Sequence, residues 1–212
     1  MDPSQFIDQI RRGVAALGQE LSGESVCKCA RLLCELDCWG RRMNLTAIRG
    51  RDAMVNGHVL DSLSVRPHIL GNTLIDVGTG AGFPGLPLAI AEPDIDVELI
   101  DSNGKRISFI RHVIGELGIS NARAIKVRVE DYEPDRRFDT VIARAFASLP
   151  RLVDLAGHLV AERGVMLAQK GRYPADELNE IPDGWEYSVS ELTVPGLHVR
   201  HLVKLHRRET DG

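Results

Sequence analysis

The chain has no long apolar run. Although 43% of its 212 residues are hydrophobic, no segment approaches the roughly 18 to 20 consecutive apolar residues that a membrane-spanning helix needs. The first residues, Met1 to Ser4, also lack the basic and then apolar pattern of a secretion signal. These two absences predict a cytoplasmic protein with no membrane partner.

Cysteine is absent after residue 38. The spacing of Cys27, Cys29, Cys34 and Cys38 matches no zinc or iron–sulfur pattern, so no metal site is expected. At about 100° per residue, three of them share one helical stripe and Cys29 points away from it. We interpret them as reduced thiols that act as small buried hydrophobes. Any chemistry after residue 38 proceeds without a cysteine nucleophile.

An excess of positive charge is also missing. The net charge of −4 argues mildly against a nucleic-acid partner. The distribution of charge weakens that objection, because residues 41–72 carry five arginines against two acids, and residues 200–208 carry four Lys or Arg and two histidines. Solvated surface charge is the alternative explanation for both clusters.

The first 70 residues have helical periodicity. Apolar residues recur at steps of three or four from Phe6 to Leu17, and Ser22 begins a second helix that continues through Cys38. A third helix is expected from Asp52 to about Val65, before a proline. We therefore predict an N-terminal helical cap over residues 1–70.

The period changes at Thr73, where short β-branched runs begin to alternate with amphipathic segments. This alternation predicts an α/β fold with a parallel, doubly wound sheet. The expected strands are 73–77, 96–100, 124–129, 138–143 and 164–169, and the expected helices are 86–91, 107–117 and 149–160. Residues 185–194 and 197–206, separated by Pro195 and Gly196, predict an antiparallel hairpin at the sheet edge. Such a hairpin resembles the class I methyltransferase architecture, here over residues 71–212.

Residues 74–85 run from an apolar strand into a glycine-rich turn that opens a helix. Such a turn brings backbone amides close to a nucleotide-like cofactor. Counted from Gly80, the glycines match a dinucleotide fingerprint. Counted from Asp76, the acidic residue followed by Gly78, Gly80 and Gly82 resembles motif I of S-adenosylmethionine (SAM) dependent methyltransferases. The turn alone leaves both cofactors open.

Acidic residues after the strands help to choose between the cofactors. Asp101, 19 residues after Gly82, is placed to bind ribose hydroxyls, which both cofactors carry. Asp76 suits the cationic amino group of a methionine moiety, directly or through water; its alternative role is to stabilise the loop. Val129 and Glu130 follow the third strand, where methyltransferases commonly contact adenine; a solvated turn is the alternative. Together with the hairpin, these residues favour SAM.

Motifs that are absent after the fourth expected strand limit the class of methyl acceptor. Residues 143–146 are Ala-Arg-Ala-Phe, where an exocyclic-amine methyltransferase typically carries Asn/Asp-Pro-Pro-aromatic. A carbon-5 pyrimidine enzyme needs a cysteine that this region does not contain. An acceptor that is already nucleophilic, such as guanine N7, remains, and it requires orientation and electrostatics more than a general base.

Five motifs in order along the chain closely resemble the RsmG family, also called GidB. They are Asn44-Leu45-Thr46, His58-x-x-Asp61-Ser62-Leu63, the glycine turn 76–85, Arg144-Ala145-Phe146-Ala147 and Lys170-Gly171. The family comprises bacterial methyltransferases of small-subunit ribosomal RNA. The resemblance implies SAM as cofactor and, as acceptor, N7 of a guanine in 16S rRNA, guanine 527 in the conventional rRNA numbering.

The resemblance also implies roles for individual residues. Gly78 and Phe83 would border the cofactor, and Val129 and Glu130 would meet its adenosine end. Arg144 would lie beside the reacting centre, where it would contact the cofactor and position the substrate. For Arg144, a salt bridge across the top of the sheet is the alternative.

Several residues are candidates for RNA contact. His58 shares a helix face with Asp61 and Ser62, and either joins the cap to the sheet or touches RNA. Phe146 would stack on a base, although core packing is the alternative. The complete set of substrate-binding candidates is Arg41, Arg42, Asn44, Thr46, His58, Phe146 and Lys170.

Three other functions fit parts of the pattern. A small NAD-dependent oxidoreductase would need a catalytic group such as Tyr-x-x-x-Lys, which the chain does not contain. A degenerate methyltransferase fold would serve as an RNA-binding or ribosome-assembly module. A third possibility keeps the chemistry and changes the acceptor. The principal expectation is an enzyme that acts as a monomer on the small ribosomal subunit.

Overall fold

Seven strands form one mixed sheet in the order β3-β2-β1-β4-β5-β7-β6 in the computed structural model, which describes residues 2–43 and 45–208. Strands β1 to β5 pair in parallel, and β7 is antiparallel to both β5 and β6. The strands are β1 (Thr73–Val77), β2 (Asp96–Asp101), β3 (Ala122–Lys126), β4 (Phe138–Arg144), β5 (Val160–Lys170), β6 (Trp185–Leu192) and β7 (Arg200–Arg207). The predicted doubly wound sheet with an antiparallel edge hairpin is confirmed.

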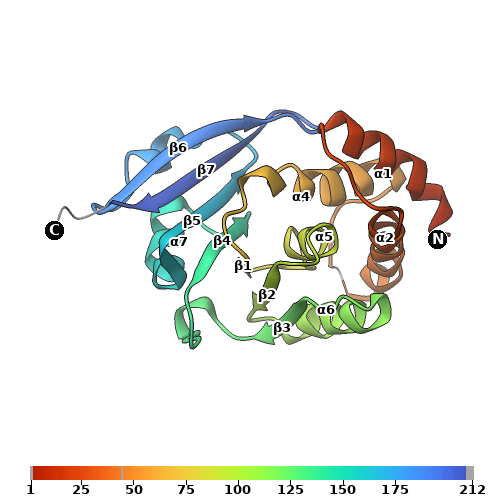
Figure 1. Cartoon of the computed structure of the whole chain (residues 1–212), viewed down its shortest axis with the longest axis horizontal. Coiled ribbons are helices and arrows are strands. Elements are labelled where there is room, and N and C mark those ends of the chain that lie inside the picture. The colour runs from red at the N-terminus through yellow and green to blue at the C-terminus, as the bar shows by residue number, and fades with distance from the viewer. Residues whose placement is uncertain (1, 44, 209–212) are drawn as a thin grey trace.

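Helices cover both faces of this sheet. Figure 1 shows α5 and α6 on the side that faces α1 and α2, and α7 on the opposite side. The α-helices are α1 (Ser4–Ala16), α2 (Gly23–Met43), α3 (Arg51–Met54), α4 (Asp61–Leu63), α5 (Gly85–Ala91), α6 (Gly104–Leu117), α7 (Leu149–Ala156) and α8 (Ala175–Leu178). The other helical segments are the π-helical η1 (Val55–Leu60) and the 3-10 turns η2 (Arg66–His68), η3 (Val129–Asp131) and η4 (Gly157–Leu159).

The two faces of the sheet contribute to two hydrophobic cores. Successive residues of β1 alternate between them, since Leu74 joins the core under α5 and α6 while Ile75 joins the core under α7. Phe6 and Ile10 of α1 are fully buried in the first core. The N-terminal helices therefore share this core with α5 and α6, and the division at residue 70 stays a prediction.

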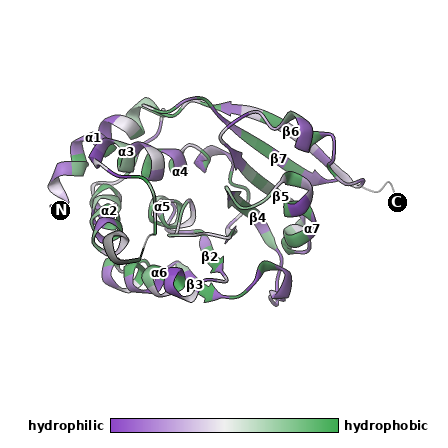
Figure 2. Cartoon of the chain, turned by 180° about the vertical axis from the view of Figure 1, so that it is seen from behind, coloured by the Kyte–Doolittle hydropathy of each residue, from purple (hydrophilic) through white to green (hydrophobic). Residues whose placement is uncertain are grey.

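The hydropathy of the helices fits this packing. In Figure 2, hydrophobic and hydrophilic residues alternate along α1, α2 and α6, as expected of helices with one covered face. The side-chain hydroxyl of Ser22 accepts the backbone N–H of Ser25 at 3.0 Å, so the predicted cap of the second helix is present. None of the helices within the described residues has the length and apolar character to cross a membrane.

The predicted helix 52–65 is interrupted. Its middle, Val55–Leu60, is a π-helical turn between the short α-helices α3 and α4. A π-turn shifts the following side chains around the helix axis, which periodicity in the sequence does not reveal. His58 lies in this π-helical turn, and Asp61 begins the α-helical turn that follows it.

Three boundaries also differ from the prediction. Strand β3 ends at Lys126, and Val129 lies in the turn η3, not in a strand. Helix α7 ends at Ala156, and Val160 already begins β5. The hairpin strands are joined by residues 193–199, a longer connection than the expected two-residue turn.

The cysteine prediction is partly wrong. Cys29, expected to point away from the buried stripe, is the cysteine in the core, whereas Cys27 and Cys38 are exposed and Cys34 is half-buried. The reason is that α2 turns Val26, Cys29 and neighbouring apolar residues toward the core. Burial raises the pKa of the Cys29 thiol to about 12.

Candidate active site

The glycine turn lies between β1 and α5 and brings backbone close to side chains from other elements. Gly78 has a φ of 65°, and a Cβ atom there would lie 2.2 Å from the Phe146 ring. Both the left-handed conformation and the close approach therefore require glycine at this position. Gly82 is similarly confined, with a φ of 88° and the Leu86 side chain 2.4 Å from a Cβ position.

Asp76 is fully buried beneath this turn. Its Oδ2 accepts hydrogen bonds from the Thr79 hydroxyl at 2.6 Å and from the Gly85 N–H at 2.7 Å. Burial raises the pKa of Asp76 to about 6, although these two hydrogen bonds oppose the shift. Asp76 lines neither cavity described below, so the structure gives it the loop-stabilising role, and its contact with a cofactor stays a prediction.

Asp101 ends β2 and is bonded on both carboxylate oxygens. Oδ1 accepts the Asn103 N–H at 2.8 Å, and Oδ2 accepts the Gly80 N–H at 3.0 Å and the Arg106 guanidinium at 3.1 Å. These bonds tie the end of β2 to the glycine turn and to the first turn of α6. The carboxylate is thereby held at the carboxyl end of the sheet, where doubly wound proteins bind nucleotides.

A cavity of about 350 Å³ lies next to Asp101. Val129 and Glu130 of η3 border it, and so does Phe146, which follows β4. The expected ribose and adenine residues thus share one cavity. Phe146 is here, packed over Gly78, and it does not line the larger cavity described next, so its stacking on a base stays a prediction.

A larger cavity of about 930 Å³ opens beside the first. Segments that are far apart in the sequence meet in it, since its walls include Thr46 before α3, His58 of η1, Phe83 of the glycine turn, Arg144 of β4 and Leu197 of the hairpin loop. Gly78, Arg106 and Ala145 line both cavities. The two cavities therefore meet beside the glycine turn.

Arg144 lies at the top of β4, between the sheet and the N-terminal helices. Its Nη1 donates to the Gly57 carbonyl at 2.9 Å and to Asp61 Oδ2 at 2.8 Å. The guanidinium also lies 5.7 Å from the centre of the Phe83 ring. The salt bridge to Asp61 holds Arg144 in the wall of the larger cavity.

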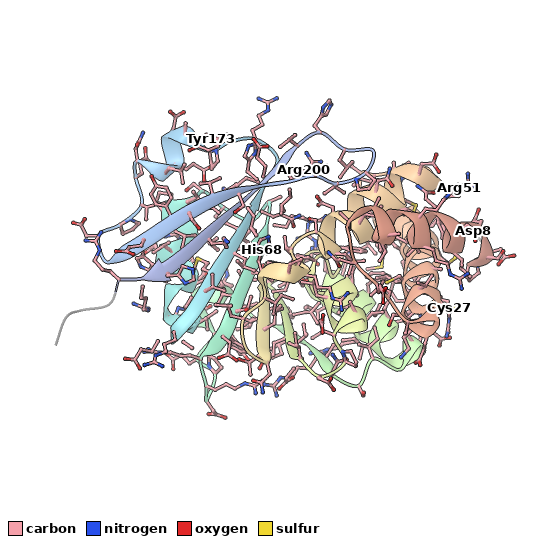
Figure 3. All side chains as sticks on the ribbon, turned by 45° about the horizontal axis from the view of Figure 1, so that its top comes forward. Asp8, Cys27, Arg51, His68, Tyr173 and Arg200 are labelled. Atoms are coloured by element: carbon pink, nitrogen blue, oxygen red, sulfur yellow. The ribbon has the colours of Figure 1, made fainter. Side chains whose placement is uncertain are left out.

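Asp61 is the hub of a polar cluster that the sequence analysis did not assign. Its Oδ1 lies 3.5 Å from the Arg200 guanidinium, and its backbone carbonyl accepts the Gln169 amide at 2.7 Å. Both partners line the larger cavity. Figure 3 shows Arg200 where β7 meets the loop that reaches toward the N-terminal helices. Gln169 lies near the carboxyl end of β5. Its one signal in the sequence is this position, because doubly wound sheets bind ligands at the carboxyl ends of their strands.

His58 is buried against the glycine turn. Its ring stacks on Phe83 with centroids 4.5 Å apart, and Nε2 lies 3.0 Å from the Thr46 hydroxyl. Burial, with a smaller contribution from the positive charge of Arg144, lowers the pKa of His58 to about 3. His58 is therefore neutral near pH 7. Its hydrogen bond stays within the N-terminal region, its ring contacts the glycine turn, and its contact with RNA stays a prediction, since it lines the larger cavity.

This pKa makes a testable contribution to stability. The unfolded histidine binds a proton near pH 6.5 and the folded one near pH 3, so the free energy of unfolding falls as pH drops below 6.5, by up to roughly 1.4 kcal/mol per pH unit. The raised pKa of Asp76 has the opposite effect below pH 6. Urea titrations of wild type and His58→Gln between pH 5 and 7.5 measure this contribution. We expect the free energy of unfolding to fall more steeply with decreasing pH in wild type than in the variant. Parallel pH profiles would contradict it.

Ala145 separates the two cavities in a strained conformation. Its φ of 51° makes it the one residue other than glycine with positive φ among the described residues. The left-handed region is costly for a residue with a Cβ atom, and such strain clusters at functional sites. The turn directs Arg144 into the larger cavity and Phe146 into the smaller one.

The remaining candidates differ in place. Lys170 lines the larger cavity, but its ammonium is bound by the Ala147 carbonyl at 2.9 Å and by Glu177 at 2.7 Å. Arg41 and Arg42 lie at the end of α2, and their side chains are outside the described part of the structure, as is the whole of Asn44. Among the residues that the structure describes, no three metal-binding side chains form a group.

The strand order, the antiparallel hairpin and the cavities at the carboxyl ends of the strands define a class I SAM-dependent methyltransferase fold. The O-methyltransferase from Bacillus cereus in complex with SAH has the same fold, with a TM-score of 0.58 and 12% sequence identity over 84% of this chain and 91% of that chain.

Sequence comparison is more specific than fold. Residues 26–203 match the family model of rRNA small subunit methyltransferase G, GidB, and the chain belongs to this family. It is 45% identical over 200 residues to ribosomal RNA small subunit methyltransferase G of Chromobacterium violaceum, covering 93% of this chain and 96% of that protein. The corresponding protein of Idiomarina loihiensis is 49% identical over 175 residues, covering 82% and 85%. The protein is thus an rRNA methyltransferase by family, and the predicted resemblance is confirmed.

Proposed function

We propose that this enzyme transfers a methyl group from SAM to N7 of a guanine in 16S rRNA, guanine 527 in the conventional numbering. The observation that carries the proposal is the pair of cavities that meet at Gly78 and Ala145. One has the residues for a nucleoside cofactor, and the other is lined by cations suited to an anionic nucleotide. Two ligands in these cavities would meet at the glycine turn.

The smaller cavity fits the adenosine part of SAM. Asp101 ends β2 with a carboxylate that ribose hydroxyls can bind, and Val129 has an apolar side chain for the face of adenine. Glu130 lies beside Val129 in η3, with a carboxylate for the exocyclic amine of adenine. SAM, when bound, supplies a methyl group on a positively charged sulfur.

The larger cavity fits an RNA nucleotide. Arg106, Arg144, Lys170 and Arg200 line it, against the carboxylates of Asp52 and Asp61. Formal charge therefore favours a phosphate-bearing ligand there. Its volume of about 930 Å³ lies in the range of small-molecule sites and leaves room for a base with its sugar.

Arg144 orients the guanine in this proposal. A guanidinium bonded to N7 would occupy the attacking lone pair, so Arg144 has to donate to O6 or to a phosphate oxygen. N7 becomes positively charged as its bond to the methyl carbon forms, and Asp61 behind Arg144 offsets that charge. No proton leaves N7, so a neutral, buried His58 is compatible with the reaction.

Methyl transfer to mapped rRNA tests this proposal. Wild-type protein is incubated with labelled SAM and small ribosomal subunits or stripped 16S rRNA, and the modified nucleotide is located by reduction and strand cleavage at N7-methylguanine. We expect one labelled guanine at position 527. Label on a pyrimidine, on an exocyclic amine or on ribosomal protein would contradict the acceptor assignment.

A further inference from the structure

The first turn of α6 places Arg106 between the two cavities, and it lines both. Its guanidinium donates to Asp101 Oδ2 at 3.1 Å, while 45% of the side chain stays exposed. The sequence analysis gave Arg106 no role. Its position links the carboxylate expected to bind ribose with the cavity expected to bind RNA.

Asp101 has little capacity left for another strong donor. Its carboxylate is 5% exposed, Oδ1 already accepts the Asn103 N–H, and Oδ2 accepts the N–H of Gly80 as well as Arg106. A ribose diol donates two hydrogen bonds, which a carboxylate accepts best with one on each oxygen. The backbone donors are fixed by the turn, so Arg106 is the partner that a ribose can displace.

The two carboxylates that line the larger cavity already have cationic partners, and Asp52 lies 3.3 Å from the Arg51 guanidinium. Arg144 lies 2.8 Å and Arg200 3.5 Å from Asp61, the nearby buried acid. Lys170 is paired with Glu177 at 2.7 Å. The three other cations of this cavity are thus already paired, and a released guanidinium there is suited to an incoming phosphate, which it binds with charge-assisted hydrogen bonds.

We infer that Arg106 is an RNA-binding residue that exchanges partners: it binds Asp101 until a cofactor ribose takes that carboxylate, and it then binds a phosphate of the substrate RNA. This inference rests on the proposed function. Cofactor binding thereby frees one cation for RNA, so the two ligands favour each other's binding. Thermodynamic linkage requires the effect to be reciprocal.

Equilibrium binding separates this exchange from other roles. The probes are SAH, which carries the ribose but transfers no methyl group, and a 16S rRNA fragment containing the target guanine. The Kd of the RNA is measured with and without saturating SAH for wild type, Arg106→Met and Lys105→Met. Lys105 is the matched control because it is the preceding, exposed residue of the same helix turn and lines neither cavity.

We expect SAH to tighten RNA binding at least about fivefold in wild type and Lys105→Met, and less than twofold in Arg106→Met. The Kd of SAH alone should be unchanged or lower in Arg106→Met. With SAH bound, we also expect a weaker salt dependence of RNA binding in that variant. The magnitude of the slope of log K for RNA against log salt concentration should be smaller than in wild type by about 0.7 to 0.9.

Three results would overturn the exchange: no effect of SAH on RNA binding by wild type, equal coupling in wild type and Arg106→Met, or a several-fold weaker Kd of SAH in Arg106→Met, which would place Arg106 on the cofactor itself. A wild-type protein that binds no SAH would instead overturn the proposed cofactor. The inference and the proposed function therefore fail through different measurements.

Discussion

Arg144→Ala is expected to lower kcat for rRNA methylation by about 100- to 1,000-fold while the Kd of SAM changes less than about threefold. The magnitude is that of removing one charged or hydrogen-bonding group that orients and stabilises a reacting centre. Arg144 lines the larger cavity but not the smaller one, so its loss should affect acceptor positioning more than cofactor binding. Single-turnover rates and calorimetric titration with SAM measure the two effects separately.

A double variant distinguishes this role from a salt bridge alone. Removing Arg144 leaves the buried carboxylate of Asp61 with Arg200 at 3.5 Å as its remaining ionic partner, which destabilises the site by itself. Replacing both Arg144 and Asp61 by alanine removes that unpaired charge. We expect the double variant to regain thermal stability but not activity. Recovery of near wild-type kcat would show that Arg144 acts only through its salt bridge.

Asp101→Ala is expected to weaken SAM binding by roughly 100-fold. Two hydrogen bonds from ribose to a carboxylate contribute about 3 kcal/mol together, which corresponds to that factor. The variant also loses the acceptor of the Gly80 and Asn103 N–H groups, so the glycine turn is less well held. Calorimetric titration with SAM and with SAH measures the change.

Asp94→Ala is the matched control for this loss. Asp94 is an exposed acid before β2, far along the strand from Asp101, and it borders neither cavity. Its replacement removes one negative charge, as Asp101→Ala does, but at the opposite end of β2. It should leave the Kd of SAM within twofold of wild type. A similar loss in both variants would mean that net charge, and not the Asp101 carboxylate, determines affinity.

The sheet could be predicted because its signals are local. Strand β1 is a short apolar run that ends at a glycine turn, and a buried parallel strand needs little else, as Leu74, Ile75 and Val77 show. The π-turn 55–60 could not be predicted, because it depends on tertiary contacts such as the bond from Arg144 to the Gly57 carbonyl. The side of α2 that is buried was likewise decided by packing, and it placed Cys29 in the core.

The residues of the smaller cavity were more predictable than those of the larger one. Asp101, Val129 and Glu130 follow strands whose carboxyl ends must meet at one edge of a parallel sheet. The larger cavity instead combines the helical segment, the glycine turn and the hairpin loop, so residues such as Arg200 and Gln169 come together only in three dimensions. Asp61 stood in a predicted motif, but its partners did not follow from the sequence.

The most direct test of the two-cavity arrangement is a crystal structure of the protein with SAH and a guanine nucleotide. We expect adenosine beside Val129 and Glu130, with its ribose on Asp101. The sulfur should lie at Gly78, and guanine should occupy the larger cavity with N7 toward that sulfur. Adenosine in the larger cavity, or a ribose that makes no contact with Asp101, would contradict it.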